Sequence, residues 1–429
     1  MNKSHDPLQN DASADKAKNV AVGNSTGGFD IYGTAMSEKK IISLFFLMTI
    51  FLSYISLGLP DSIWGVVWPN ARADFGAPQE FAGYYSMTVT FCCMLSALFS
   101  LRLAKHFGAG KIAAVSCLLT GGAIFFGGFV GDKYLFFIVA VVMGFGSGAV
   151  DAVLNEYIAN HYSSKIMNWL HASWGVGAMI SPLILTVWIN RGNWRGGFFT
   201  IGAIQTALAV LFFSTLFLWK RKHGIKGENV ESITPYAPEL TMKNLAPWLC
   251  VLIFFLYVGA EGAVGVWLKT LLYDTRGIDN TKAGIAVSLY YASIMAGRVG
   301  VGFFSKKIGN RNAIRFGLAL ALIGALSLGI NNYYLNLLSV FLIGAGFAPV
   351  YPSMMHETTR RFSKETASKT IGFQMAGASA GAMLCVPAVG FIGAASTMEI
   401  LTIFAAVAAI AMFAASEAVN RMTLKRKER

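Results

Sequence analysis

The stretch that decides the fold of this chain reads Leu57-Gly58-Leu59-Pro60-Asp61-Ser62-Ile63-Trp64. It lies in a long apolar segment, and Asp61 is the only charged residue between positions 41 and 68. An ionised carboxylate at the depth of a lipid bilayer costs about 2.5–3.5 kcal/mol, so such a residue normally faces a protein interior or an ion or substrate path. Gly58 and Pro60 weaken the local helix, because proline lacks an N–H group and its ring crowds the preceding turn. We therefore expect Asp61 to lie beside a break in a membrane-spanning helix.

The composition of the whole chain also indicates a membrane protein. Hydrophobic residues make up 55% and charged residues 13%, whereas a soluble domain carries about 25% charged residues. A membrane-spanning helix needs roughly 20 mostly apolar residues, and such runs recur from end to end. The sequence predicts an all-α membrane protein with twelve transmembrane helices, near residues 41–69, 79–104, 111–131, 134–160, 167–190, 196–219, 246–273, 281–304, 312–331, 334–357, 370–393 and 396–417.

Residues 1–39 differ from the rest, because they are polar and contain few large apolar groups. They cannot bury a core, and we expect a disordered tail. The apolar run that follows is too long for a secretory signal and lacks a small-residue cleavage site.

The cysteines all fall in apolar runs, and no pair of them has the spacing of a metal site. We interpret them as packing residues rather than as disulfides, and the sequence predicts no metal site and no cofactor. The five are Cys92, Cys93, Cys117, Cys250 and Cys385.

The formal net charge of +13 needs no nucleic-acid partner. Most basic residues fall in the tails and in the loops on the same side of the predicted spans as the N-terminus. Cytoplasmic loops of membrane proteins carry an excess of Lys and Arg. The distribution therefore predicts a multi-pass protein of the cytoplasmic membrane with both termini in the cytoplasm.

A polar stretch from Lys220 to Asn244 follows the sixth predicted span. We interpret residues 220–245 as a cytoplasmic linker between six-helix bundles at 40–219 and 246–419, with a basic cytoplasmic tail at 420–429. The two bundles share patterns at an offset of about 200 residues, which predicts pseudo-symmetric halves with a site between them. The matching pairs are Gly108 with Gly309, Gly144-Phe145-Gly146 with Gly344-Ala345-Gly346, Gly177-Ala178-Met179 with Gly381-Ala382-Met383, and Asp61 with Glu261.

Twelve spans, a central linker and basic glycine turns at 101–111 and 302–312 make the region from Ile41 to Val419 similar to the major facilitator superfamily. In that family the turn after the second span usually carries an acid in a Gly-x-x-x-Asp-Arg-x-Gly pattern. Lys105 and Lys306 stand at the corresponding positions here. The resemblance therefore implies a cytoplasmic gate at these lysines without the usual charge relay.

Three stretches resemble the fucose permease-like branch of this superfamily, which includes glucose and mannose importers. They are Tyr257–Trp267 in the seventh span, Asp151-Ala-Val-Leu-Asn155 in the fourth and Met167–Gly175 in the fifth. The match in the first span is weaker, because Asp61 lacks the neighbouring asparagine of the branch. The resemblance implies proton-driven sugar uptake.

Three acids are predicted as proton-coupling residues. Asp61 and Glu261 occupy matching positions in the repeat, and the family resemblance implies that both lie at a central cavity. Asp151 lies four residues before Asn155, so these two share one helix face. Burial in a low dielectric favours the protonated form of a carboxyl group, which suits a group that loads and releases protons. The alternative is a neutral acid bonded to backbone at a helix break or, for Asp151, a packing pair with Asn155.

Several polar and aromatic side chains are predicted to bind the substrate. Asn155 would bind a hydroxyl group, His171 would donate to one or join a proton relay, and Trp174 would lie against the apolar face of a sugar. For each of them, helix packing or an interfacial anchor is the alternative. The further candidates are Trp64, Trp267, Tyr290, Tyr291, Tyr351 and Gln374.

Two charged residues inside predicted spans are assigned to the gate or to the structure. Glu156 points about 100° away from its neighbour Asn155, and we interpret it as a gate or surface charge. Arg298, in the eighth span, is expected to snorkel or to pair with an acid near the gate.

These observations predict a secondary active transporter, not an enzyme, that imports a small polar solute. The expected solute is in the first place a monosaccharide, and the expected mechanism is proton-coupled symport by alternating access. Sodium is an alternative coupling ion. The first alternative function is an exporter or antiporter for a drug, siderophore or other metabolite, and the second is a non-transporting receptor or membrane enzyme. The expected partners are the solute, protons and membrane lipid, without nucleic acid, and we expect a monomer.

Overall fold

The computed structural model describes residues 38–161, 164–219 and 237–424, and these parts contain helices and no strand. The described residues from Ser43 onward form one compact unit. Residues 1–37 of the predicted tail at 1–39, most of the predicted linker at 220–245 and the last five residues of the basic tail lie outside the described residues. Residues 38 and 39, which the sequence assigned to the tail, begin helix α1.

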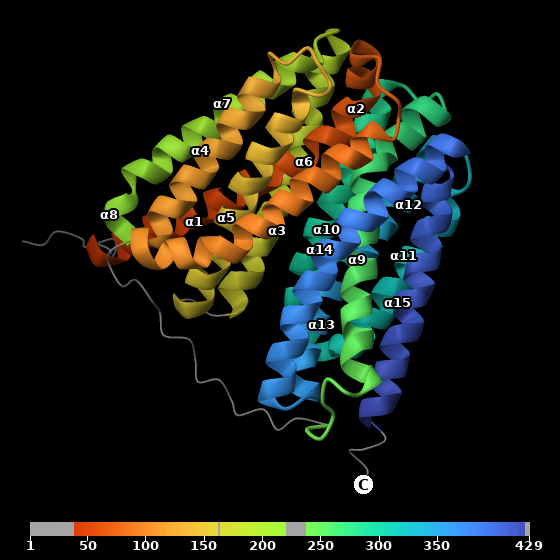
Figure 1. Ribbon diagram of the computed structural model, residues 1–429. Coiled ribbons are helices and arrows are strands. Elements are labelled where there is room, and N and C mark those ends of the chain that lie inside the picture. The colour runs from red at the N-terminus through yellow and green to blue at the C-terminus, as the bar shows by residue number, and fades with distance from the viewer. Residues whose placement is uncertain (1–37, 162–163, 220–236, 425–429) are drawn as a thin grey trace, which may run out of the picture. The chain divides into compact units, whose positions relative to one another are not determined.

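The first half of the described chain, called the N half, contains eight helices that Figure 1 draws from red to yellow-green. They are α1 (Glu38–Asp61), α2 (Ile63–Phe75), α3 (Phe81–Phe107), α4 (Ala109–Gly127), α5 (Phe136–His161), α6 (Ser164–Asn190), α7 (Trp194–Ser214) and α8 (Leu216–Trp219).

The second half, called the C half, runs from green to blue in the same view. It contains α9 (Leu245–Thr270), the π-helix η1 (Leu271–Thr275), α10 (Asn280–Ile308), α11 (Asn310–Leu328), α12 (Tyr333–Phe347), α13 (Val350–Arg361), α14 (Lys364–Ala395) and α15 (Ile400–Leu424).

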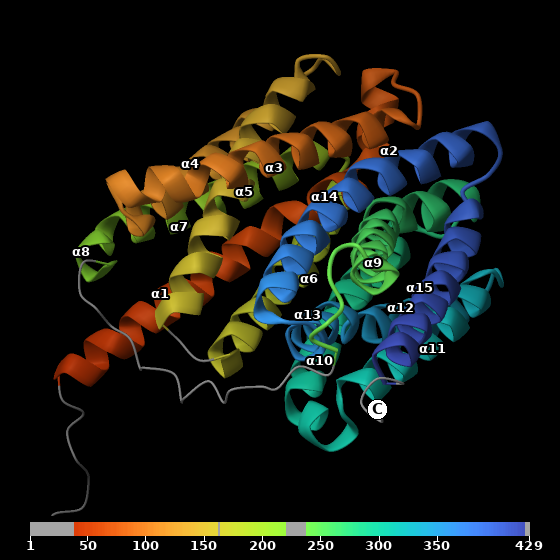
Figure 2. The same cartoon turned by 60° about the horizontal axis from the view of Figure 1, so that its bottom comes forward.

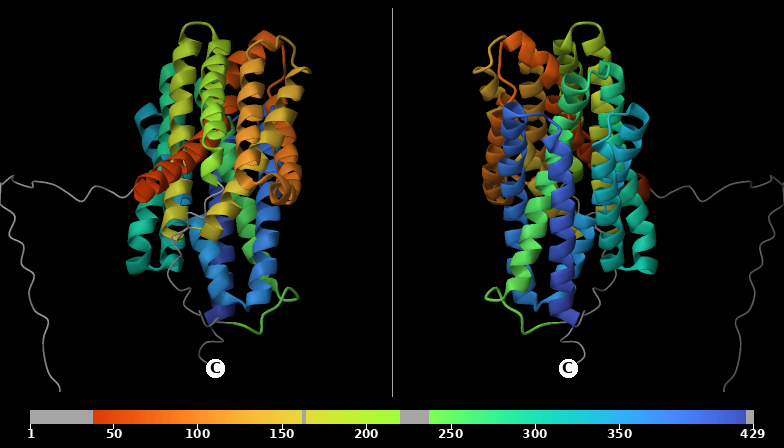
Figure 3. Two further views of the ribbon diagram at one scale, coloured as in Figure 1. Left: turned by 90° about the vertical axis from the view of Figure 1, so that its left-hand side faces the viewer. Right: turned by 90° about the vertical axis from the view of Figure 1, so that its right-hand side faces the viewer.

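Twelve helical stretches of the described chain are long and apolar enough to cross a membrane. The predicted all-α architecture with twelve spans is therefore confirmed, and Figure 3 shows most of these helices running side by side. Single boundaries differ by up to six residues, as in the eleventh span, which begins at Lys364 rather than at 370. The Ser363 side chain accepts a hydrogen bond from the Thr366 backbone amide and so caps an additional helical turn.

The first span is broken where the sequence predicts it. α1 ends at Asp61 with Pro60 inside it, and α2 starts at Ile63. Ser62, between the two helices, donates its hydroxyl to the backbone carbonyl of Ala178 at 3.1 Å. This bond ties the break to α6.

The internal repeat appears in the backbone of the loops. Gly76 (φ 55°) and Gly277 (φ 65°) follow equivalent spans, and so do Gly108 (φ 89°) and Gly309 (φ 78°). Glycine adopts such positive φ values without the strain that other residues meet. The helix packing repeats as well, since α3 packs on α5 as α10 does on α12, and α4 on α7 as α11 does on α15. We call the side of Gly76 and Gly277 the Gly76 end and the opposite side the Gly108 end.

The two halves contact each other at the Gly76 end. Arg72 of α2 forms an ion pair with Asp274 of η1 at 3.4 Å. Asn190 of α6 accepts a hydrogen bond from Asn280 and donates one to Thr281 of α10, both at 2.7 Å. α3 also packs on α14, a contact that can be followed in Figure 2. The N half and the C half are thus joined by polar and ionic contacts at this end.

Glycines allow the helix backbones to approach closely where α1 crosses α6. A Cβ atom on Gly58 would meet the carbonyl oxygen of Trp174, and one on Gly177 would meet that of Ile55. Small residues serve this purpose in membrane helices, because packing rather than the hydrophobic effect holds the helices together. The crossing fixes the position of Asp61 relative to α6.

Gly177→Val is expected to lower the free energy of unfolding by about 1–3 kcal/mol, because the added side chain must push two backbones apart. The matched control is Gly122→Val, since Gly122 is also helical but has no atom within 4 Å of its added Cβ. Thermal unfolding in detergent measures both variants. Equal losses of the free energy of unfolding in Gly177→Val and Gly122→Val would contradict the close approach of α1 and α6.

Lys269 in α9 is fully buried, and its ammonium group has no hydrogen-bond partner among the described residues. Lys269→Met is therefore expected to raise the free energy of unfolding by about 1–3 kcal/mol, because it removes a buried group with unmade hydrogen bonds. Lys105→Met, at an exposed position of α3, should change it by less than about 0.5 kcal/mol. A stability loss in Lys269→Met would instead indicate a strong ion pair.

Candidate functional site

Polar side chains from both halves meet near the middle of the spans. We call this group the central cluster. Its N-half members are Tyr54, Asp61, Asp151, Asn155, His171 and Trp174, and its C-half members are Tyr257, Glu261, Tyr290, Tyr291 and Arg298.

Asp61 is exposed although it lies inside a membrane span. Its carboxylate accepts a hydrogen bond of 2.6 Å from the indole Nε1 of Trp174 on α6. It also interacts electrostatically with Asp151 of α5 and Glu261 of α9. These partners place the carboxyl group between the two halves rather than against lipid.

Asp151 is likewise exposed within its span. It accepts a hydrogen bond of 2.9 Å from the Asn155 amide, whose oxygen accepts one of 2.8 Å from the Tyr54 hydroxyl. The Tyr54 ring meets His171 edge to face, with 5.4 Å between ring centroids. The acid and amide share one helix face as their spacing predicts, and α1 and α6 complete the group.

Glu261 is the one predicted acid with an ion-pair partner among the described residues. Arg298 lies 3.3 Å from its carboxylate and donates a hydrogen bond of 3.1 Å to the Tyr257 hydroxyl. The Tyr290 hydroxyl donates to the Glu261 backbone carbonyl at 3.0 Å. The side chains of Glu261 and Arg298 are only 13% and 17% exposed. The charge of Glu261 is therefore compensated inside the C half, whereas Asp61 and Asp151 have no ion-pair partner among the described residues.

Trp174 connects the acids of the N half to this ion pair. The guanidinium carbon of Arg298 lies 5.0 Å from its ring centroid, within the range of cation–π attraction. The Tyr291 ring meets the same indole edge to face at 6.1 Å. Arg298 thus pairs with an acid, one of the two outcomes expected for it, and α10 brings this side chain into the central cluster.

Three predicted substrate-binding residues lie outside the central cluster. Trp64 is buried and stacks on Tyr85 with 4.1 Å between centroids. Trp267 is fully buried, and its Nε1 donates to the Val386 carbonyl at 2.7 Å. Gln374 is fully buried and donates to the Thr358 hydroxyl at 3.2 Å. Helix packing, the alternative named for such residues, describes these contacts.

The remaining predicted residues occupy different places. The half-buried Tyr351 packs on Tyr257 with 6.2 Å between centroids, next to the central cluster. Lys105 is exposed near the end of α3. The side chains of Glu156 and Lys306 lie outside the described residues. No group of metal-ligating side chains occurs among the residues that the structure describes, and all five cysteines are free.

Tyr54 and Tyr257 are not among the site residues predicted from the sequence. A signal for Tyr54 was present, because it lies two helical turns before Asp61 and so on the same face. Tyr257 lies one turn before Glu261 in the same way.

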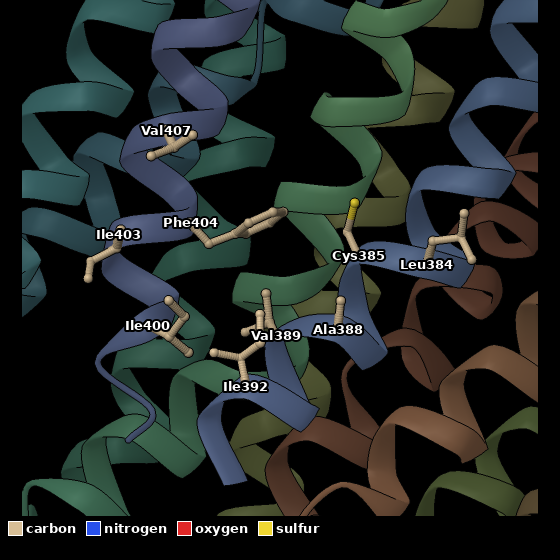
Figure 4. A pocket seen from close by; sticks show the side chains of 9 residues that line it. All are labelled: Leu384, Cys385, Ala388, Val389, Ile392, Ile400, Ile403, Phe404 and Val407. Carbon is tan, nitrogen blue, oxygen red and sulfur yellow. The ribbon is translucent and has the colours of Figure 1, made fainter. Parts of the chain in front are cut away.

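An apolar groove of about 380 Å³ lies between α14 and α15 and is separate from the central cluster. Figure 4 shows its lining, which consists of aliphatic side chains, one phenylalanine and one cysteine. It offers no side-chain group that could orient a polar solute. The lining residues are Leu384, Cys385, Ala388, Val389, Ile392, Ile400, Ile403, Phe404 and Val407.

Comparison with protein families gives one match that covers nearly the whole described chain. The model of the Major Facilitator Superfamily matches residues 46–355 and 249–428. The two matched segments overlap, as expected for a chain built from two similar halves.

Several relatives are named as transporters or transport proteins. The glucose/mannose transporter GlcP of Bacillus subtilis is 26% identical over 280 residues, which are 63% of this chain and 68% of that protein. The cis,cis-muconate transport protein of Acinetobacter baylyi is 23% identical over 343 residues, 73% of this chain and 83% of that protein. A probable hexose phosphate transport protein of Chlamydia pneumoniae is 22% identical over 351 residues, 73% and 76% of the two chains.

The fold also matches solved structures. A crystal structure of the nucleoside transporter NupG superposes with a TM-score of 0.68 at 14% identity, covering 89% of this chain and 99% of that one. An inward-facing bacterial homologue of the human lysosomal transporter Spinster gives 0.62 at 12% identity, with 92% and 98% covered. These similarities are evidence of a shared fold.

The ion pair in the central cluster generates a prediction for stability. Glu261→Gln and Arg298→Met are each expected to cost about 3–5 kcal/mol, because each leaves one charge buried without its partner. The double variant should cost less than the sum of the two. Thermal or denaturant unfolding of all three variants measures this, and strictly additive losses would contradict a direct pair.

Proposed function

Because the chain belongs to the Major Facilitator Superfamily, a family of multi-pass membrane transporters of sugars and other small solutes, we propose that it moves a monosaccharide together with protons. The movement would be symport by alternating access in the cytoplasmic membrane. The observation that supports this most is the presence of two exposed carboxyl groups, Asp61 and Asp151, within membrane spans. Acids are kept at that depth at a cost, and they commonly mark proton or substrate paths.

The charge balance of the central cluster favours a neutral solute with protons. The cluster holds three carboxyl groups and one guanidinium group, and that guanidinium already faces Glu261. An anionic solute would meet the two uncompensated acids, whereas a proton or a neutral polyol would not be repelled. Among the relatives, the charge balance of the central cluster agrees best with GlcP, whose name specifies glucose and mannose.

The geometry around Asp151 suits sugar hydroxyl groups. Asp151 and Asn155 supply acceptors and donors within one hydrogen-bonded group, and the half-buried His171 lies next to Tyr54. Tyr351, half-buried near the C-half members, supplies an aromatic ring for the apolar face of a sugar. In our proposal Asp61 and Asp151 load the protons, and Glu261 maintains the charge balance of Arg298.

Alternating access would proceed by rocking of the N half against the C half about the central cluster. With both termini in the cytoplasm, the Gly76 end faces outward. The contacts of Arg72 with Asp274 and of Asn190 with α10 would then close the outer side. The domain boundaries at 40–219 and 246–419 and a monomeric assembly remain part of this proposal.

An exporter or antiporter for a drug, siderophore or other metabolite is the alternative, and sodium is the alternative coupling ion. The muconate and hexose phosphate relatives indicate that related chains carry other solutes. Anionic solutes would need more positive charge than the central cluster offers. The direction of flux and the coupling ion are therefore the two quantities to measure.

Purified protein in liposomes is expected to accumulate labelled D-glucose, D-mannose or L-fucose when the outside is made acidic. Asp61→Asn and Asp151→Asn should each reduce this accumulation at least about tenfold, because the amide cannot carry the proton. Glu365→Gln is the control, since Glu365 is an exposed surface acid. A sodium gradient replaces the proton gradient in a parallel series. Flux against the imposed gradient, or accumulation untouched in both Asp variants, would contradict proton symport.

A further inference from the structure

Trp174 occupies an unusual position for a residue expected to bind a sugar. Its indole N–H donates to Asp61 at 2.6 Å, while Arg298 lies 5.0 Å from its ring centroid. Tyr291 contacts the ring from a third direction. Protein groups therefore contact the Trp174 ring both at its N–H edge and over one face.

On the N-half side, Trp174 and Asp61 are held in a fixed relation. The Trp174 carbonyl fills the space in front of Gly58, one turn before Asp61. Ser62 donates to the Ala178 carbonyl at 3.1 Å, and Ser173 donates to the Phe51 carbonyl at 3.5 Å. These contacts join α1 and α6 over two turns, so Asp61 and Trp174 move together.

On the C-half side, Arg298 is held by Glu261 and by the Tyr257 hydroxyl, both on α9. The cation–π contact with Trp174 therefore joins two groups that belong to different halves. α6 and α10 approach closely at this level, since a Cβ on Gly175 would come within 2.7 Å of the Met295 Cβ. Movement of one half against the other must change this contact.

The charge of Asp61 acts on this contact in two ways. A hydrogen bond to an ionised acceptor is stronger than one to a neutral acceptor, which fixes the indole more firmly. The negative charge at the N–H edge also makes the indole ring richer in electrons, which strengthens its attraction for the guanidinium group over its face. A proton taken up by Asp61 from the solution removes both effects.

We propose that Trp174 is a positioning residue that transmits the charge state of Asp61 to Arg298 and thereby couples proton loading to the contact between the halves. With Asp61 ionised, the contact is held. With Asp61 protonated, it is released and the halves are free to rock. This proposal rests on the proposed function, because it assumes that Asp61 exchanges the coupling proton.

Other charged or titratable groups also face this site. Asp61 interacts electrostatically with Asp151 of α5, Glu261 of α9, Tyr291 of α10 and Cys93 of α3, and Arg298 interacts with His171 of α6. The pH dependence of transport therefore contains contributions from several groups. Replacing Trp174 by another residue without a titratable group leaves all these groups in place. A change in the pH dependence of transport then reports the contribution that depends on the indole.

The test compares Trp174→Phe with Trp248→Phe in liposomes, with labelled D-glucose as the probe. Phenylalanine keeps an aromatic face but has no N–H for Asp61. Trp248 also donates its indole N–H, to the Met242 carbonyl at 2.9 Å, but it lies near the start of α9 and is 45% exposed. The measured quantity is the ratio of glucose uptake with an imposed proton gradient to uptake by exchange at equal pH.

The ratio is expected to fall at least about fivefold in Trp174→Phe and to stay at the wild-type value in Trp248→Phe. Combining Trp174→Phe with Asp61→Asn should lower the ratio no further than Asp61→Asn alone does. An unchanged ratio in Trp174→Phe, even with slower uptake, would overturn the proposal and leave the proposed function standing. Glucose uptake by the wild-type protein that does not depend on the proton gradient would overturn the proposed function itself.

If Trp174→Phe does not fold, Arg298→Lys tests the same contact from the C half. Lysine keeps a positive charge for Glu261 but loses the planar guanidinium group that lies over the indole. The ratio should again fall, and a wild-type ratio in a folded Arg298→Lys protein would overturn the proposal.

Discussion

The structure depends on the cost of placing a carboxylate among apolar helices. Asp61 and Asp151 lie within spans whose other neighbours are almost entirely apolar, and both are exposed. Neither can face lipid without a large penalty, and their observed partners come from α1, α6 and the C half. The helix break at Ser62 and the close crossings at Gly58 and Gly177 hold these partners in place. The central cluster follows from this constraint.

The three acids have different surroundings, and this difference assigns them different roles. Glu261 faces a fixed positive charge within its own half, so its ionised form is stabilised where it stands. Asp61 and Asp151 face hydrogen-bond donors from Trp174 and Asn155 but no fixed positive charge among the described residues. A neutral donor such as the Trp174 indole or the Asn155 amide can stay beside a carboxyl group in either charge state. An ion pair favours the ionised form more strongly. Within our proposal this separates the proton carriers from the group that balances Arg298.

The sequence predicted the fold almost completely, because twelve apolar runs and a repeat of about 200 residues leave few other arrangements. It also identified Asp61, Asp151 and Asn155, since a charge in an apolar run stands out and a four-residue spacing defines a helix face. It could not place Arg298, because its partner lies on a different span and helix rotation is set by packing. For the same reason the sequence could not show that Trp64 and Trp267 lie outside the central cluster. In the sequence they resemble Trp174, but their rings are buried in the packed interior of each half.

Cysteine labelling measures whether positions 61 and 151 face water between the two halves. Asp61→Cys and Asp151→Cys would be treated in liposomes with a water-soluble thiol reagent and compared with the unmodified chain, in which four of the five cysteines are buried. Val210→Cys is the reference for exposure to lipid, because Val210 is 61% exposed on α7 within a span. The account predicts rapid modification at positions 61 and 151 and none at 210. Protection of positions 61 and 151 to the level of position 210 would contradict it.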